Sequence, residues 1–186
     1  MKKKIFISAS VLLMAMFISA CDHFLDVNTD PTRLKTANIN QVLVAAEGGL
    51  GFYSGTDVYL YSSLFAQQAT GSGVAGSQTR FYDSYIVTNN DVNNIYTNYF
   101  AGVLADLDYV KKLGLSTGNP TYTGIAKIMQ AFTYQQLVDA WGDVPYKEAL
   151  KGVANVQPKY DNSKEIYDSL FVLIDAGIAQ TKLANV

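Results

Sequence analysis

The stretch Ile125–Leu150, IAKIMQAFTYQQLVDAWGDVPYKEAL, decides how this chain folds. Its apolar residues recur three and four positions apart, as in an amphipathic helix with a wide buried stripe. They are Ile125, Ile128, Met129, Phe132, Tyr134, Leu137, Val138 and Trp141. Gly142 can adopt the left-handed backbone that closes a helix, and Pro145 cannot continue one. The sequence therefore predicts a long helix that ends in a rigid turn behind Trp141.

Four further segments show helical spacing of apolar residues, at 38–50, 57–69, 93–112 and 162–177. Asn38 and Asn162 are expected N-caps, and each has a Gln or Glu three residues on, as a capping box requires. Glycines at 48, 49 and 51 are expected to loosen the end of the first helix. The short link Gly118–Pro120 favours an antiparallel hairpin. Helices with one buried stripe each must pack on one another, so the fold class is all-α.

The first residues indicate a targeting segment. Lys2–Lys4 form a positive stretch, and Ile5–Ile18 is a mostly apolar run too short for a stable transmembrane helix. The small residues before Cys21 resemble a bacterial lipobox, which predicts cleavage after Ala20 and a lipid on Cys21. The alternatives are an ordinary signal peptide with an incidental cysteine, or an uncleaved anchor. Cys21 is the one cysteine of the chain, so no disulfide can form within it.

Residues 21–37 are predicted to form an extended tether after the lipidated Cys21. They lack periodicity and contain the turn cluster Asn28–Pro31. His23 is the one histidine of the chain and has no second ligand beside it, so we expect a solvated residue rather than a metal site. The lipid would hold the body of the protein at a membrane.

The overall composition excludes some classes of partner. The formal net charge is −2, with 16% charged and 49% hydrophobic residues, so no strongly basic surface suggests a nucleic acid. Tyrosine is unusually frequent, with 13 residues. Because tyrosine combines a large ring with a hydroxyl, it suits both packed helices and wet binding surfaces.

Three segments between the helices invite a functional interpretation. Gly71–Gly76 matches the GxGxxG dinucleotide pattern, which requires a strand before it and a helix after it. A helical pattern precedes it here, so we expect a flexible loop. Asn89–Asn94 is rich in oxygen ligands but lacks the glycine and closing glutamate of a calcium loop, so we expect it to cap a helix. Arg80–Val87 is expected to be a short extended piece or an ordered loop.

No catalytic constellation emerges from the residue pattern. Asp139, Asp143 and Glu148 surround the turn after the central helix, and a glycosidase would need two carboxylates facing one cleft. We expect Asp143 to accept backbone N–H bonds and the other two to be solvated. No Ser/His/Asp set or metal cluster can be assembled around a single histidine. Trp141 is assigned to the core, with stacking on a sugar as the alternative.

Several segments together resemble one protein family. They are Leu137–Gly152 (LVDAWGDVPYKEALKG), Pro158–Asp161, Lys164–Tyr167 and, soon after Cys21, Phe24–Arg33 (FLDVNTDPTR). This set is similar to the SusD/RagB-like nutrient-binding lipoproteins of Bacteroidota outer membranes. The resemblance spans most of the chain that follows the predicted signal peptide.

The resemblance implies an all-α fold of tetratricopeptide-like helical hairpins that form a superhelix with irregular loops. It assigns residues 1–20 to a lipoprotein signal peptide, 21–37 to the tether and 38–186 to the N-terminal helical part of a SusD-like domain, which we expect to be truncated. It leaves the ligand-binding residues unknown.

The function implied by the resemblance is non-enzymatic. Such a protein captures an oligosaccharide, or less often a peptide, and delivers it to a SusC-like TonB-dependent outer-membrane transporter. It needs no cofactor and no metal, and the lipid anchor holds it to the outer membrane facing the cell surface. The alternative is a lipid-anchored helical-repeat scaffold that binds a protein partner without capturing a nutrient.

Overall fold

The computed structural model describes residues 37–71, 73–74 and 77–183. The chain divides into two units, Met1–Ala37 and Asn38–Val186, and almost all described residues belong to the second. Within this described part, no helix combines the length and the apolar character that crossing a membrane requires.

The predictions for the N-terminal unit stay predictions. The signal peptide at 1–20, the lipidated Cys21 and His23 lie outside the described residues. The same holds for the tether at 21–37 apart from Ala37.

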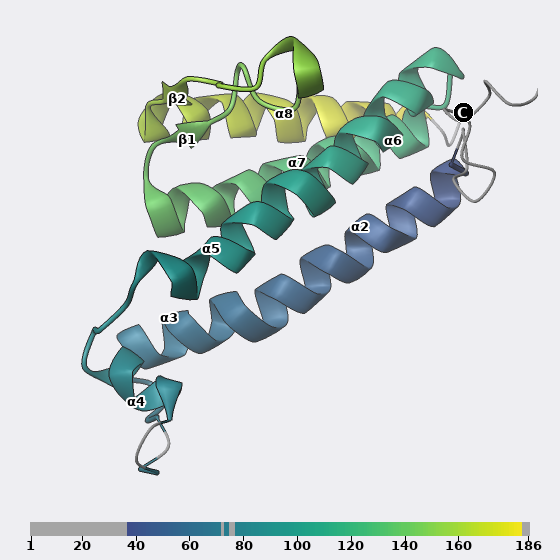
Figure 1. Cartoon of the computed structure of the whole chain (residues 1–186). Helices are drawn as coiled ribbons and strands as arrows, with labels where there is room; N and C mark the ends of the chain where they lie inside the picture. Colours follow the sequence, from purple (N-terminus) through teal and green to yellow (C-terminus); the bar gives the residue numbers. More distant parts are fainter. Residues whose placement is uncertain (1–36, 72, 75–76, 184–186) are drawn as a thin grey trace, which may run out of the picture. The chain divides into compact units, whose positions relative to one another are not determined.

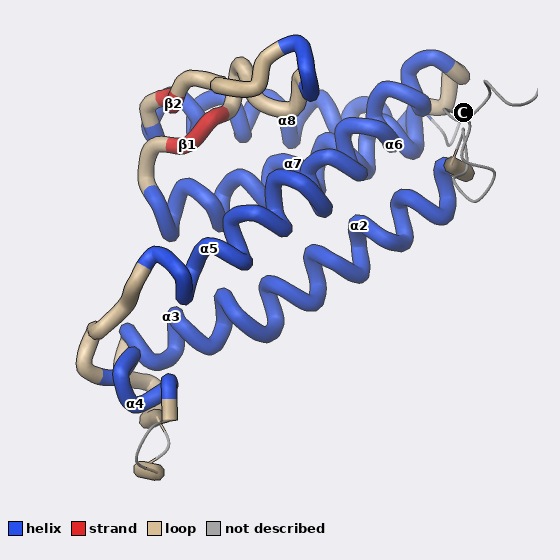
Figure 2. The backbone as a smooth tube through the Cα atoms, viewed as in Figure 1, coloured by secondary structure: helices blue, strands red, loops and turns tan. Residues whose placement is uncertain are grey.

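Four long helical runs make up the described part of the Asn38–Val186 unit (Figure 1). They are α2 (Ile39–Tyr53), continued through a first π-helical segment (Ser54–Val58) into α3 (Tyr59–Phe65); α5 (Asn89–Asn98), continued through a second π-helical segment (Tyr99–Leu104) into α6 (Ala105–Ser116); α7 (Pro120–Trp141); and α8 (Ser163–Leu183). The shorter elements are α4 (Gln78–Asp83), the strands β1 (Val144–Pro145) and β2 (Tyr160–Asp161), and a 3₁₀ turn (Gly152–Ala154). Helix dominates and the strands are short (Figure 2), which confirms the all-α prediction.

The long helices form successive layers. α2 packs on α6, α6 packs on α7, and α7 packs on α8 (Figure 1). The core between these layers is built from aliphatic and tyrosine side chains that are almost fully buried. They include Ala46, Ile95, Tyr99, Val103, Leu104, Leu107, Val110, Leu137 and Ile166. Because α7 lies between α6 and α8, it is covered on two sides.

The central helix was predicted correctly, but its first buried stripe was not. Tyr134, Leu137 and Val138 are buried as expected, whereas the side chain of Phe132 is 49% exposed. In the first half of α7 the buried positions are instead small or polar. They are Thr123, Gly124, Ala126, Gln130, Ala131 and Thr133. A helix with neighbours on two sides needs small side chains where the backbones approach, and this requirement overrides the apolar periodicity.

Glycines allow a close approach of α7 and α8. A Cβ atom on Gly177 of α8 would lie 2.7 Å from Ile128 Cγ1 and 2.9 Å from the Gly124 carbonyl oxygen of α7. A Cβ atom on Gly124 would lie 2.6 Å from the Gly177 carbonyl oxygen. The packing of α7 on α8 at this crossing therefore requires that Gly124 and Gly177 carry no side chain.

Gly177→Ala is expected to destabilise the chain by about 1–3 kcal/mol, because the added methyl group overpacks the α7–α8 contact. Urea unfolding of the full chain, followed by circular dichroism, measures the change. Gly48→Ala is the matched control, since Gly48 is an exposed helical glycine with nothing within 4 Å of a Cβ atom. The control should be neutral or stabilising by up to about 1 kcal/mol. Equal stability of Gly177→Ala and the unaltered chain would contradict this account of the packing.

The predicted helix ends are largely confirmed. The Asn38 side chain accepts a hydrogen bond from Asn40 N at 2.9 Å, and Asn162 accepts one from Lys164 N at 3.1 Å. Asn119 caps α7, whose first residue is a proline, and the preceding Gly118 has a φ of 67°. Gly142 closes α7 with a φ of 75°. Local chemistry was enough to place these ends.

Two predictions for the first half of the chain need correction. The segments 38–50 and 57–69 are not separate helices, because the glycines between them are accommodated in one continuous helical run that ends at Phe65. Arg80–Val87 is not extended, since its first part belongs to α4. Asn89–Asn94 lies within the start of α5, whose N-cap is Thr88, and Asp91 of this segment completes the capping box. Helix α3 precedes Gly71, so the strand that a dinucleotide site needs is not there.

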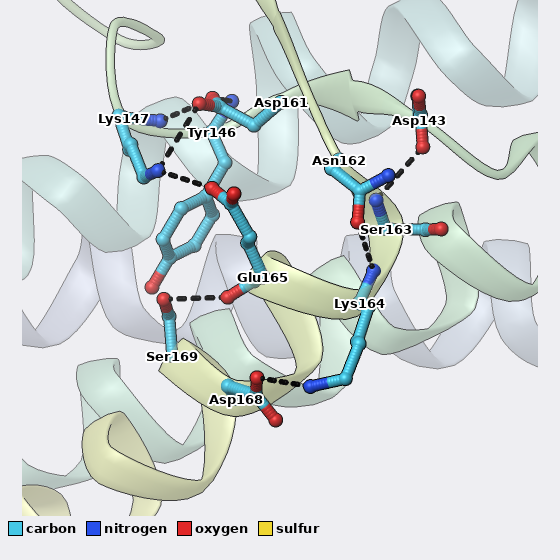
Figure 3. Close-up of polar contacts among 10 residues, drawn as sticks. All are labelled: Asp143, Tyr146, Lys147, Asp161, Asn162, Ser163, Lys164, Glu165, Asp168 and Ser169. Atoms are coloured by element: carbon cyan, nitrogen blue, oxygen red, sulfur yellow. Dashed lines mark hydrogen bonds and ion pairs between the residues drawn. The ribbon is translucent and has the colours of Figure 1, made fainter.

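The turn after α7 is held by carboxylates (Figure 3). β1 and β2 pair antiparallel, Val144 with Asp161, and the Asp161 carboxylate accepts hydrogen bonds from the backbone N–H groups of Tyr146 (2.9 Å) and Lys147 (2.8 Å). Asp143 accepts one from Ser163 N at 2.8 Å, at the start of α8. Asp143 thus binds backbone N–H as predicted, but on the next helix, while Asp161 fixes the turn itself.

Candidate functional site

A pocket of about 430 Å³ opens between α3, the start of α5 and the C-terminal end of α7. Its volume falls within the range of roughly 300–1,000 Å³ that is typical of small-molecule sites. Its lining combines aromatic, aliphatic and polar side chains. They are Val58, Tyr61, Ser62, Phe65, Val87, Val92, Ile95, Asp139, Ala140 and Trp141.

Aromatic rings reach this pocket from two helices. Tyr61 and Phe65 of α3 lie in a stacked arrangement, with ring centroids 6.1 Å apart and an interplanar angle of 26°. Trp141 at the end of α7 contacts Tyr96 edge to face at 5.5 Å. Trp141 is half-buried, so it is both a packing residue and part of the pocket wall. The two interpretations of Trp141 from the sequence are therefore compatible.

Hydrogen bonds orient the Tyr61 ring. Its hydroxyl donates to the Asp91 carbonyl oxygen at 2.9 Å, and the Tyr82 hydroxyl donates to the Asp91 carboxylate at 3.0 Å. The Tyr82 ring meets Tyr61 edge to face at 4.9 Å. Asp91 also accepts from the Thr88 N–H at 2.8 Å and from the Thr88 hydroxyl at 2.6 Å. The aromatic wall is therefore fixed before any ligand arrives.

The same contacts shift two pKa values. Hydrogen bonds from Thr88, and then from Tyr82, lower the pKa of Asp91 below its usual value, so Asp91 is a carboxylate at neutral pH. Burial, followed by the hydrogen bonds with Tyr61 and Asp91, raises the pKa of Tyr82. Tyr82 therefore stays protonated and keeps donating to Asp91.

The polar groups of the pocket suit recognition more than chemistry. Ser62 and Tyr61 carry hydroxyls whose oxygens can accept further hydrogen bonds, and Asp139 is the one carboxylate among the described lining residues. The Asp139 carboxylate already accepts hydrogen bonds from Gln135 and Tyr167. Aromatic faces for apolar contact and a few polar groups for orientation are what a neutral, ring-shaped ligand requires.

The three carboxylates considered for glycoside hydrolysis do not meet in this pocket. Asp139 lines it, Asp143 accepts from Ser163 N, and Glu148 accepts hydrogen bonds from the Asn155 side chain (3.2 Å) and Lys159 N (3.3 Å). Each of them therefore has a structural role in hydrogen bonding. In the part of the chain that the structure describes, no group of three or more His, Cys, Asp and Glu side chains is placed to hold a metal ion.

A second hollow lies between α7 and α8, with a volume of about 390 Å³. Phe132, Tyr167 and Phe171 contribute to its lining, which otherwise is almost wholly aliphatic. Its nearly apolar surface offers few hydrogen-bond partners, so it suits helix packing better than a hydroxylated ligand. For this reason the pocket with Tyr61, Phe65 and Trp141 is the candidate site.

The family comparison agrees with this architecture. The chain matches the model of the SusD-like family, described as starch-binding and associating with the outer membrane, over residues 33–186. The chain therefore belongs to the SusD-like family, which is a family of binding proteins rather than of enzymes. No curated protein sequence matches the chain.

A solved structure is similar as well. A chitin-binding protein superposes with a TM-score of 0.62 and 27% sequence identity, and the match covers 77% of this chain. The chain spans 31% of the length of that protein. The similarity therefore concerns the helical portion that the two proteins share.

Proposed function

We propose that this chain is the helical part of an outer-membrane lipoprotein that captures an oligosaccharide and delivers it to a SusC-like TonB-dependent transporter, without catalysing a reaction. The observation that carries the proposal is the pocket in which aromatic rings from α3 and α7 lie beside hydroxyl and carboxylate groups. Pyranose rings present apolar C–H faces that pack on aromatic rings, while their hydroxyls need hydrogen-bond partners. Family membership supports the same ligand class.

Among oligosaccharides, we expect N-acetylated glucosamine units to bind best. The solved relative is named for chitin binding, and the pocket adds Val58, Val87, Val92 and Ile95 to its aromatic rings. The methyl group of an acetamide can pack against these aliphatic side chains. A starch unit has no acetamide group. Starch oligosaccharides are the comparison ligand because of the family description.

Hand-over to the transporter requires a change of state. A ligand can drive closure over the transporter only if it binds the closed state more tightly than the open state. The proposal therefore assigns capture of the oligosaccharide to the pocket, and its delivery to the complex of this protein with the transporter.

Trp141→Ala is expected to weaken binding of chitin oligosaccharides by roughly ten-fold, because one aromatic wall of the pocket is lost. Isothermal titration calorimetry with the full chain measures the affinity. Phe132→Ala is the matched control, since Phe132 is an aromatic residue of the same helix that lies outside the pocket. Equal affinities of both variants, or no affinity of the unaltered chain for chitin or starch oligosaccharides, would argue against capture at this site.

Membrane attachment is proposed to depend on a lipid at Cys21. Cys21→Ser is expected to abolish incorporation of radiolabelled palmitate and to remove the protein from the outer-membrane fraction, because several acyl chains are needed for firm anchoring. His23→Ala, two residues on, is expected to leave both unchanged. A Cys21→Ser protein that still fractionates with the outer membrane would contradict the anchor.

The alternative function is a helical scaffold that binds a protein partner. It is favoured by apolar side chains of α7 and α8 that remain exposed, notably Phe132, Phe171 and Val172. A scaffold predicts that the unaltered chain binds no oligosaccharide, so the calorimetric experiment separates it from capture.

A further inference from the structure

The two π-helical segments of the described residues meet at their first residues, and the first segment ends at Val58, which belongs to the pocket wall. The first begins at Ser54 and the second begins at Tyr99. The Ser54 hydroxyl and the Tyr99 hydroxyl are 3.3 Å apart, although they come from different helices. A π-helical turn inside an α-helix contains one extra residue and frequently marks a functional site.

One side chain of α7 binds both segments. The Gln136 Oε1 atom accepts a hydrogen bond from the Tyr99 hydroxyl at 2.6 Å and from the Ser54 hydroxyl at 3.1 Å. Its Nε2 atom donates to the Ser54 Oγ atom at 3.0 Å. Tyr99 is fully buried, and this burial raises its pKa, so its hydroxyl stays protonated as a donor. Gln136 therefore joins three helices at the level of the π-helical segments.

The spacing of inward-facing residues shows what the first π-helical segment does. In α2 the buried residues Leu43, Ala46 and Leu50 follow helical spacing. Two α-helical turns cover about seven residues, so an uninterrupted helix would next present Asp57 and then Leu64 on the same stripe. The pocket wall instead contains Val58, Tyr61, Ser62 and Phe65. Val58 and Phe65 each follow by one residue the positions that an uninterrupted helix would present, Asp57 and Leu64.

One extra residue turns the following helix by about 100°. Val58, Ser62 and Phe65 thereby face the pocket, whereas Leu64 is buried but does not line it. Tyr61 lies on the edge of both stripes. Without the extra residue, the wall opposite Trp141 would be formed by a different set of side chains.

We infer that Gln136 is a positioning residue for the pocket: by holding the first π-helical segment against Tyr99, it keeps the extra residue in place and so turns Val58, Ser62 and Phe65 toward Trp141. The nature of the ligand rests on the proposed function, but the geometry of the pocket does not. Gln136 lies five residues before Trp141 on α7, so its hydrogen bonds to Ser54 connect the two helices that form the facing walls of the pocket.

Deletion of Gly55 tests the extra residue directly. Gly55 is exposed, and nothing lies within 4 Å of a Cβ atom built on it, so its loss removes one residue without removing a side-chain contact. The matched control is Gly55→Ala, which keeps the number of residues. Trp141 is the one tryptophan of the chain, so acrylamide quenching of tryptophan fluorescence reports on the pocket without any ligand.

In the full chain, deletion of Gly55 is expected to raise the quenching constant of Trp141 roughly two-fold and to weaken chitin oligosaccharide binding about ten-fold. Gly55→Ala is expected to match the unaltered chain in both. If the deletion variant shows a cooperative thermal transition and the same quenching and affinity as the unaltered chain, the inference is wrong.

If deletion of Gly55 prevents folding, Gln136→Met tests the same inference. Its control is Gln130→Met, because Gln130 is a buried amide of the same helix that accepts a hydrogen bond from Lys111 at 3.1 Å, away from the pocket. Gln136→Met should raise quenching and lower affinity, and Gln130→Met should lower only thermal stability. Gln136→Glu keeps the oxygen acceptor and should recover most of the affinity. If Gln136→Met and Gln130→Met change quenching and affinity equally, Gln136 only stabilises the fold and the positioning role is wrong.

The ligand-free readout separates this inference from the proposed function. If the unaltered chain binds no oligosaccharide but the deletion still exposes Trp141, the proposed function fails and the positioning role of the π-helical segment stands. If oligosaccharide binds and the deletion changes neither quenching nor affinity, the proposed function stands and the positioning role fails.

Discussion

The close contact of α7 with its two neighbours is the constraint on which the described unit depends. Gly124 and Gly177 allow α7 and α8 to meet backbone to backbone, and small or polar residues line the rest of the buried face in the first half of α7. Because α7 is covered on two sides, its axis and its end are fixed. Trp141 and the turn held by Asp161 therefore occupy defined positions, and a ligand would meet a preformed wall.

The second wall of the pocket is fixed by a different means. It belongs to a helical run that would face elsewhere without one additional residue, and Gln136 connects that run to α7 through hydrogen bonds. Tyr61 is oriented in turn by Asp91 and Tyr82. A recognition surface of rigid aromatic rings loses little conformational entropy on binding. This small entropy cost suits a protein whose family binds carbohydrate and whose proposed function is capture followed by release.

Much of the fold could be predicted from the sequence, since its determinants are local. The periodicity of Tyr134, Leu137 and Val138, the stop at Gly142 and the caps at Asn38 and Asn162 depend on a few neighbouring residues, and the structure confirms them. The exposed Phe132 was mispredicted because the neighbours of a helix are not visible in its own periodicity. The pocket was not predicted, since its aromatic residues are about 80 positions apart and their direction depends on a π-helical turn. Leu50 and Val58 are eight residues apart, about one more than two α-helical turns contain. This extra residue can be interpreted only once the position of the facing helix is known.

The central claim is that the aromatic residues of α3 and α7 together form an oligosaccharide site. A crystal structure of the full chain soaked with chitin tetrasaccharide tests it most directly. The account predicts a sugar ring packed against Tyr61, Phe65 and Trp141, with its hydroxyls near Ser62 and Asp139. A sugar bound elsewhere on the chain, with this pocket empty or filled by protein side chains, would contradict it.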